Sequence, residues 1–168
     1  QQGIDVVAGY VEPHARPKTA ALLNGLEVLP TREVFYNGMI LDEFDIGMAL
    51  KRKPQLILVD ELAHTNAEGC RHAKRYQDIK ELLNAGIDVY TTVNVQHIES
   101  LCDTVASITE IVVRERIPDS IFDNADQVEL IDIEPQDLID RLNTGNVYRQ
   151  TQAKQAVENF FTIENLTA

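Results

Sequence analysis

The sequence predicts an α/β fold built on a doubly wound, mostly parallel β-sheet with a small β-hairpin insertion. Three observations predict it: two short runs are apolar at almost every position, helical patterns alternate with such runs, and the length of 168 residues suits one domain. Strands buried on both faces of a parallel sheet have continuous apolar runs of this kind. We therefore expect a single domain over residues 1–168, with one sizeable core.

The first predicted strand is the run IDVVAGYV at residues 4–11. A helix should follow it, because Pro17 suits a first helical turn and Gly25 suits a helix end. The next signal is Asn37-Gly38 between apolar triplets. Both residues tolerate positive φ, so the pair predicts a two-stranded hairpin.

A helix is expected after the hairpin. Asp42 can cap its N-terminus, because a short carboxylate accepts hydrogen bonds from the free amides of a first turn. The side chains expected to point inward are Phe44, Met48 and Ala49. The basic run at 51–53 suits the C-terminus of this helix, where the helix dipole favours positive charge.

Strand and helix patterns continue to alternate in the rest of the chain. The predicted elements are a central parallel strand at 56–59, a long loop at 62–74, a helix at 75–85, a strand at 89–95, a helix at 98–108, strands at 111–113 and 128–131, a helix from Pro135 to Gly145, and an amphipathic helix at 153–161. This alternation is what favours a doubly wound sheet.

Composition limits the possible partners. The 15 basic and 27 acidic residues give a net charge of -12, so the chain as a whole repels nucleic acid and anionic lipid, and a phosphate site must be local. Two cysteines, Cys70 and Cys102, are too few for a disulfide scaffold and fit a reducing cytosolic compartment. No run reaches the ~18 apolar residues of a membrane span. The abrupt start in a strand suggests a piece of a longer protein.

Asp60 and Glu61 directly follow the predicted central strand. In open α/β sheets, ligands bind beyond the carboxyl ends of the strands. Four apolar residues followed by Asp-Glu match the second phosphate-binding motif of P-loop NTPases, the Walker B motif. There the aspartate holds Mg²⁺ and the glutamate orients or deprotonates the attacking water. The alternative is an acidic pair that only ends a strand and caps the next turn.

The loop after this strand offers a possible zinc site. His64, Cys70 and His72 are potential ligands. However, the sequence has no Cys-x-x-Cys pair, no His-Glu-x-x-His pattern and no fourth ligand at a customary spacing. Zinc is therefore a minor alternative at this loop.

Three positive side chains, Arg71, Lys74 and Arg75, lie within five residues. Such a group makes a local positive region that could meet a phosphate in spite of the negative total charge. The alternative is the solvated start of a helix. Neither interpretation is excluded by the sequence.

Other polar residues follow the neighbouring strands. Asn94, Gln96 and His97 end one of them and could sense a γ-phosphate or the catalytic water, or could cap the following helix. His14 and Arg16 have a similar position after the first strand. No Ser-His-Asp or Cys-His-Asn arrangement with a nucleophile elbow is present, so hydrolysis through a covalent intermediate is not expected.

Several longer runs form a pattern. The two longest are LILVDELAHTN at 56–66 and GIDVYTTVNVQHIES at 86–100. Shorter ones are GYVEPH at 9–14, EFD at 43–45, RH and KR within 71–75, IPD at 117–119 and ADQVEL at 125–130. Together these runs resemble the N-terminal cytoplasmic domain of the KdpD family, the osmosensitive potassium-channel sensor histidine kinases. The resemblance spans nearly the whole chain and is more specific than the Asp-Glu pair alone.

The resemblance implies a P-loop NTPase-like domain with two ATP-binding motifs, of which Asp60 and Glu61 match the second. It implies ATP and Mg²⁺ as cofactors. The protein would continue into a universal-stress-protein-like domain, four membrane helices and a histidine kinase core, with this domain on the cytoplasmic side of the inner membrane. Its partners would be the other domains of the same sensor kinase and, through the kinase core, a response regulator that controls potassium uptake.

The sequence departs from the family pattern at the first ATP-binding motif, because it has no Gly-x-x-x-x-Gly-Lys-Ser/Thr loop. We expect that loop just upstream of Gln1. The loop supplies amides and a lysine that hold phosphates, so the chain as given should bind ATP weakly. It also lacks the phosphorylatable histidine and the kinase core, so alone it is not expected to be the transferase.

The sequence therefore predicts a regulatory, nucleotide-linked input domain. Asp60 would stand on the magnesium side and Glu61 would be the catalytic, water-orienting carboxylate. The further cofactor-binding candidates are Arg71, Lys74, Asn94 and His97. Two alternatives stay open: a protein interaction module that needs no nucleotide, and an autonomous Mg-dependent ATPase. A homodimer through the helix that carries Phe160 and Phe161 is also open.

Overall fold

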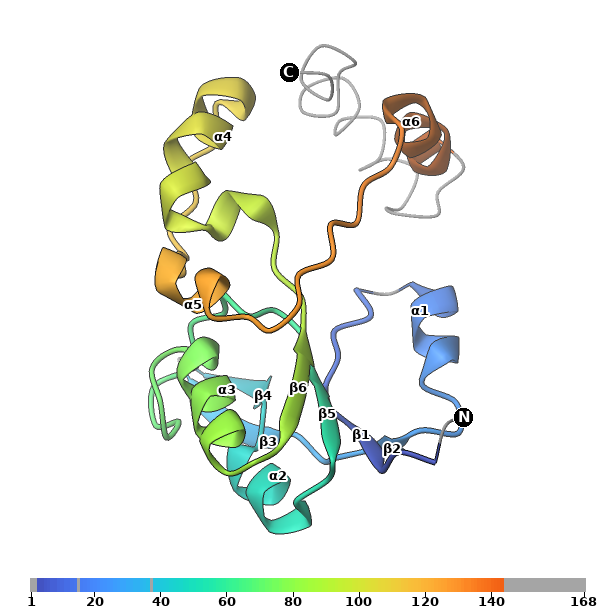
Figure 1. Ribbon diagram of the computed structural model, residues 1–168, viewed down its shortest axis with the longest axis vertical. Coiled ribbons are helices and arrows are strands. Elements are labelled where there is room, and N and C mark those ends of the chain that lie inside the picture. Colours follow the sequence, from blue (N-terminus) through green and yellow to red (C-terminus); the bar gives the residue numbers. More distant parts are fainter. Residues whose placement is uncertain (1–2, 15, 37, 144–168) are drawn as a thin grey trace.

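The computed structural model describes residues 3–14, 16–36 and 38–143, and the centre of this part is a four-stranded parallel sheet (Figure 1). The strands are β1 (Val6–Tyr10), β2 (Glu27–Val28), β5 (Leu56–Val59) and β6 (Asp88–Thr91). Their order is β2-β1-β5-β6, and each neighbouring pair is parallel. The predicted α/β class and the interior position of β5 are confirmed.

The strand order reverses direction between β1 and β5. From β1 the chain moves outward to β2 at one edge, and it then returns to β5 and continues to β6 at the other edge. Such a reversal opens a crevice beyond the carboxyl ends of the two strands that flank it. Residues that directly follow β1 and β5 are therefore well placed to meet a ligand.

Apolar side chains of the sheet and of α3 (Arg75–Asn84) form the core. Val7 and Ala8 of β1 and Ile57 of β5 are fully buried. Ile79 and Leu82 lie in the same cluster, with 6% and 0% of their surfaces exposed. Each large apolar side chain buried in this way contributes about 1.5–3 kcal/mol, so α3 is firmly held against the sheet.

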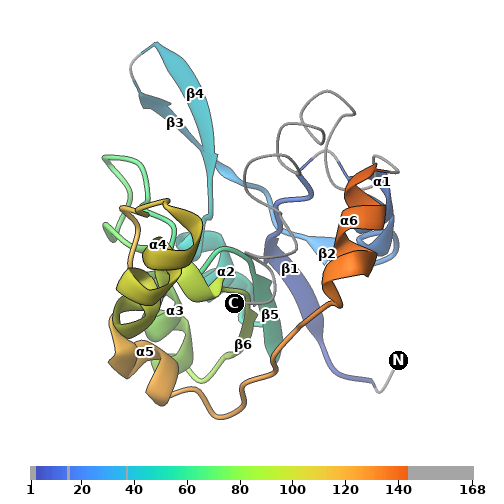
Figure 2. The ribbon, with the colours of Figure 1, turned by 90° about the horizontal axis from the view of Figure 1, so that it is seen from above.

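The other helices differ in how much they contribute to this core. They are α1 (Pro17–Leu22), α2 (Ile46–Arg52), α4 (Cys102–Thr109), α5 (Asp119–Asp123) and α6 (Pro135–Asn143). In both ribbon views α2 lies next to α3, whereas α1 lies near β1 and β2 (Figures 1 and 2). No side chain of α1 is buried. In the described part of the chain, the strand order reverses as a doubly wound sheet requires, but α1 buries no side chain against the sheet.

A hairpin of β3 (Arg32–Tyr36) and β4 (Met39–Glu43) projects from the rest of the molecule (Figure 2). Its strands are antiparallel, and Tyr36 pairs with Met39. The two residues between them are the predicted Asn-Gly pair. Gly38 has a φ of 82°, which glycine adopts without strain. The hairpin and the place of its turn are confirmed.

The predicted cap of α2 is wrong. Asp42 lies inside β4, and Asp45 is the cap, its Oδ1 accepting a hydrogen bond of 3.0 Å from the backbone N–H of Met48. The strand continues for longer than the apolar pattern indicated, so the helix begins later. As a result Ile46 and Ala49 are buried, whereas Met48 is 36% exposed rather than inward.

Two other predicted strands are also wrong. Residues 111–113 and 128–131 have no regular structure, and Val112 and Ile131 are 72% and 84% exposed. β-Branched residues favour strands only where a neighbouring strand can pair and pack with them. In this region the described residues form one isolated bridge, between Ile98 and Ile117.

Element boundaries differ in the same region. The strand predicted at 89–95 is β6, which ends at Thr91, and 3₁₀ turns at 95–97 and 99–101 precede α4. The helix predicted from Pro135 is present as α6. Its predicted end at Gly145 and the amphipathic helix at 153–161 lie outside the described residues.

Gly9 permits a close approach between β1 and its surroundings. A Cβ atom at this position would lie 2.6 Å from Cδ1 of Ile57 and 2.9 Å from Cε2 of Phe44. The register of β1 and β5 shifts between Ala8 and Tyr10, around this residue. A side chain larger than hydrogen therefore cannot fit unless the core moves.

A buried ion pair joins the hairpin to α3. Arg75 is fully buried, and its Nη2 donates to Oε2 of Glu43 at 3.1 Å. The backbone N–H of Ala67 donates to Oε1 of Glu43 at 2.8 Å, and Nε2 of His64 lies 3.1 and 3.0 Å from the two carboxylate oxygens. The guanidinium carbon of Arg75 lies 4.1 Å from the ring centre of Tyr10. The pair thus connects β1, β4, the loop after β5 and α3.

The environment of Glu43 favours its charged form. Burial alone would raise the pKa of Glu43, but hydrogen bonds from His64 and the N–H of Ala67, with the charges of His64 and Arg75, hold this pKa below the ordinary value of 4.5. A carboxylate whose pKa is lower in the folded state stabilises the fold above its unfolded pKa. This stabilisation is lost as the pH falls through the folded pKa.

We predict that Gly9→Ala destabilises the fold by about 1–3 kcal/mol, the usual effect of overpacking a core. Ile57→Val removes the Cδ1 atom nearest to the new methyl group. The double variant should therefore lose less stability than the sum of the two single variants. Urea unfolding measures all three. Strict additivity, or an unchanged Gly9→Ala, would contradict the close approach.

We predict that Glu43→Gln lowers the unfolding free energy at neutral pH by about 3–5 kcal/mol, because it leaves Arg75 buried without a carboxylate. Since this variant has no carboxylate to protonate at position 43, its stability should fall less steeply than that of the parent protein below pH 4.5. Urea titrations at several pH values measure both effects. Glu68→Gln, in the same loop but exposed, is the control. Parallel pH curves for parent and Glu43→Gln would count against the prediction.

Candidate functional site

Asp60 lies where the loops after three strands meet. It directly follows β5, and its backbone N–H donates to the carbonyl of Tyr10 at 2.9 Å. Its Oδ2 is 3.4 Å from the backbone nitrogen of Glu12, which follows β1. Its Oδ1 accepts hydrogen bonds from the N–H of Glu61 at 3.0 Å and from the hydroxyl of Thr92, which follows β6. The expected position at the carboxyl edge of the sheet is thus observed.

Glu61 lies next to Asp60 in an unusual backbone conformation. Its φ is 59°, and that of His14, which follows β1, is 48°. Residues other than glycine rarely adopt such φ angles. Where they do, the residues concentrate at functional sites. Oε1 of Glu61 is 3.5 Å from Nε2 of His14, and Oε2 is 4.0 Å from Nδ1 of His64. With 35% of its side chain exposed, Glu61 can meet both water and these imidazoles.

Arg75 contacts the residues at this edge of the sheet from the interior. Its Nη1 donates to the backbone carbonyl of Asp60 at 3.3 Å and lies 3.9 Å from Oε2 of Glu61. Because Arg75 is fully buried and paired with Glu43, it positions the loop and is not a free cation at the surface. The sequence placed Arg75 in a positive group but gave no sign that it would be buried.

Lys74 and Arg71 have other partners. Nζ of Lys74 donates to the hydroxyl of Thr65. Nη2 of Arg71 is 2.6 Å from Oε1 of Glu81 on α3. Arg71 and Lys74 of the predicted positive group therefore have partners other than Asp60, whereas Arg75 reaches the backbone carbonyl of Asp60.

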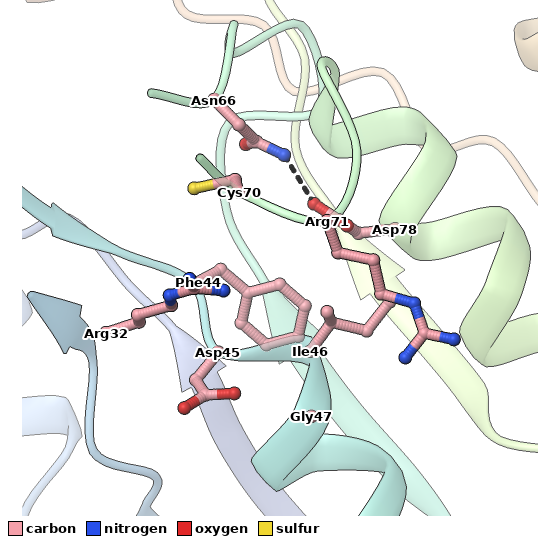
Figure 3. A pocket seen from close by; sticks show the side chains of 9 residues that line it. All are labelled: Arg32, Phe44, Asp45, Ile46, Gly47, Asn66, Cys70, Arg71 and Asp78. Atoms are coloured by element: carbon pink, nitrogen blue, oxygen red, sulfur yellow. Dashed lines mark hydrogen bonds between the residues drawn. The ribbon is translucent and has the colours of Figure 1, made fainter. Parts of the chain in front are cut away.

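A small cavity lies beside Arg71 (Figure 3). Its volume is about 170 Å³, and it is also lined by Asn66 and Asp78, whose side chains share a hydrogen bond of 2.7 Å. Burial raises the pKa of Asp78, although the hydrogen bond from Asn66 acts in the opposite direction. Ligand pockets usually measure about 300–1,000 Å³, so this cavity is too small for a nucleotide.

Asn94 and His97 do not reach Asp60. Asn94 is exposed and precedes a 3₁₀ turn, and Nδ1 of His97 is 2.7 Å from the backbone carbonyl of Glu115. The residue that does reach Asp60 from β6 is Thr92. The sequence does not single out Thr92, because its pattern predicts a strand that continues to residue 95 and contains Thr92.

The three zinc-ligand candidates have different surroundings. His64 is bonded to Glu43, and Nε2 of His72 is 2.7 Å from Oε2 of Glu81. Cys70 lines the cavity beside Arg71. Over the described residues, no group of three or more histidine, cysteine or acidic side chains is arranged to hold a metal ion.

The edge at Asp60 nevertheless suits one kind of cation. Mg²⁺ binds oxygen, keeps several waters, and is often held in nucleotide sites by one or two carboxylates together with phosphate. Asp60 and Glu61 supply carboxylate oxygens of this type. Arg75, which lies 3.9 Å from Glu61, is buried and paired with Glu43, so it leaves no free guanidinium beside these carboxylates.

Comparison with known proteins gives the family of the chain. The family model of KdpD, described as the osmosensitive K⁺ channel His kinase sensor domain, matches residues 1–168. Among the described residues, no helix is long and apolar enough to cross a membrane.

Curated relatives agree over nearly the whole chain. The sensor protein KdpD of Clostridium acetobutylicum is 60% identical over 99% of this chain and 18% of that protein. Those of Escherichia coli K12 and Mycobacterium tuberculosis are 58% and 52% identical, over 99% and 100% of this chain and 19% and 20% of those proteins. The chain thus spans about a fifth of the length of these relatives, and it belongs to the KdpD family as its sensor domain.

Proposed function

We propose that this chain is a regulatory, cytoplasmic input domain of a two-component sensor histidine kinase that controls potassium uptake, and that it responds to Mg-ATP. The observation that carries the nucleotide part is the position of Asp60 at the carboxyl edge of the sheet, where residues after three strands converge on its carboxylate. Membership of the KdpD family supports the kinase and potassium parts, because the family description names both.

In this proposal Asp60 holds the metal and Glu61 orients water. A bound Mg²⁺ would neutralise phosphate charge. Thr92 and the N–H of Glu12 hold the Asp60 carboxylate in place, so its orientation is fixed before any ligand binds. Glu61 is exposed beside His14, and an imidazole there could accept or return a proton.

The phosphate side belongs to the same proposal. A P-loop NTPase-like topology requires a glycine-rich loop, which we expect upstream of Gln1. The other candidates for nucleotide contacts are Arg71, Lys74, Asn94 and His97. Since Arg71, Lys74 and His97 contact other residues, these three would bind nucleotide only after changing partners.

Two observations support the alternatives. The exposed carboxylate of Glu61 between two imidazoles would also suit an autonomous ATPase. The projecting hairpin, with its exposed apolar side chains, would suit an interaction module that needs no nucleotide. Binding and turnover measurements separate these three functions.

We predict that Asp60→Asn in the complete sensor kinase weakens Mg-ATP binding to this domain at least about tenfold, because a neutral amide attracts the cation less. Removal of Mg²⁺ should weaken ATP binding by the parent protein more than ATP binding by the variant. Isothermal titration calorimetry, with the kinase core's own nucleotide site disabled, measures both. Asp88→Asn, exposed at the start of β6 on the opposite edge of the sheet, is the control. Equal affinities in parent and Asp60→Asn would exclude the metal role.

We predict that Glu61→Gln keeps Mg-ATP binding within about twofold, since Asp60 remains, and changes the balance between phosphorylation and dephosphorylation of the response regulator. Reconstituted phosphotransfer assays measure that balance. Phosphate release by the parent protein with its phosphorylatable histidine replaced would reveal hydrolysis by this domain. Release that Glu61→Gln abolishes would favour the autonomous ATPase instead.

A further inference from the structure

The outer face of the hairpin carries two cross-strand pairs of different character. Phe35 and Ile40 are directly opposite each other, and they are 77% and 64% exposed. The next pair on this face is Glu33 opposite Asp42, and both are exposed. Residues two apart on a strand point to the same face. An apolar pair near the turn and an acidic pair below it therefore form one surface, which we call the outer face.

The inner face of the hairpin contacts the rest of the domain at the end away from the turn, whereas Tyr36 and Met39, next to the turn, are 42% and 61% exposed. Val34 is buried, and Glu43 is paired with Arg75. Arg32, the only basic residue of β3, is also on this side, and its Nη2 donates to the carbonyl of Gly69 at 3.1 Å. The outer face thus has no neighbouring cation from its own strands.

Without a partner, the outer face combines repulsion between two carboxylates with exposed apolar side chains. Like charges directly opposite each other destabilise an antiparallel pair, and an isolated two-stranded hairpin is marginally stable in water. Exposed apolar side chains grouped beside polar ones mark binding surfaces. A partner could cover Phe35 and Ile40 with apolar side chains and place positive charge beside Glu33 and Asp42. It would then remove the exposed apolar surface and the repulsion between the two carboxylates.

Charge excludes several occupants. Two copies of the outer face would bring their acidic pairs together, which opposes a dimer through this surface. A net charge of -12 opposes nucleic acid and anionic lipid. The chain spans 18%, 19% and 20% of the length of the three sensor proteins compared above, so most of such a protein lies outside the described domain and can supply a partner segment.

We propose that the outer face docks a segment from another domain of the same sensor kinase, in which Lys or Arg residues stand beside apolar side chains. This goes beyond the nucleotide function and does not depend on it. Apolar contact would come from Phe35 and Ile40, and Glu33 and Asp42 would select the basic segment.

The test is photo-crosslinking in the complete sensor kinase in its membrane. Phe35 is replaced by p-benzoylphenylalanine, and the crosslinked peptides are identified by mass spectrometry. The expected product is an intramolecular or inter-subunit crosslink to a basic, apolar segment outside residues 1–168. The same amino acid at Val112, which is 72% exposed and far from the hairpin in sequence, is the control and should not give this product.

Charge variants test the selectivity. Glu33→Lys with Asp42→Lys should reduce the crosslink at least about fivefold. Glu68→Lys with Asp88→Lys makes the same change in net charge away from the outer face, and should reduce it less than about twofold. If the first variant does not fold, Glu33→Gln alone and a rise in salt concentration should each lower the yield.

The proposal would be overturned by a crosslink to lipid, to the hairpin of a second copy, to the response regulator or to an acidic segment. Absence of any crosslink from Phe35 would also overturn it, as would a yield that is insensitive to the charge variants. Running the assay with and without Mg-ATP separates this result from the nucleotide proposal, because the crosslink is expected in both conditions.

Discussion

The buried pair of Arg75 and Glu43 is the interaction on which the rest of the structure depends. Arg75 contacts the ring of Tyr10 at the end of β1, the carbonyl of Asp60 after β5 and the carboxylate of Glu43 at the end of β4. One guanidinium thus fixes three separate segments relative to α3. A buried charge that lost its partner would be strongly destabilising, so these segments hold their arrangement together.

This arrangement determines what the edge of the sheet can bind. Because Arg75 is turned inward, the surface above it presents the carboxylates of Asp60 and Glu61 without a free guanidinium beside them. Such an edge attracts a hydrated cation and repels a bare phosphate. The nucleotide proposal therefore places the metal on this part of the chain and the phosphates mainly on an upstream loop. The left-handed conformations of His14 and Glu61 place strained backbone at this edge of the sheet.

The sequence predicted those features that are set by local patterns. Continuous apolar runs located β1 and β5, Asn-Gly located the hairpin turn, and Asp60 was expected at the carboxyl edge because it directly follows β5. Features set by long-range contacts were missed. Nothing local shows that Arg75 is buried, since its partner Glu43 is 32 residues away. Likewise, residues 111–113 and 128–131 have the composition of strands, but the described chain offers them no neighbouring strand.

The central claim is that the edge at Asp60 holds the cation of a bound nucleotide. Iron-mediated cleavage tests it most directly: Fe²⁺ replaces Mg²⁺ in the complete protein with ATP, and ascorbate with peroxide then cuts the backbone close to the metal. The account predicts cuts near Glu12, Asp60 and Thr92 that excess Mg²⁺ suppresses. Cuts confined to other parts of the domain, with these three segments intact, would contradict it.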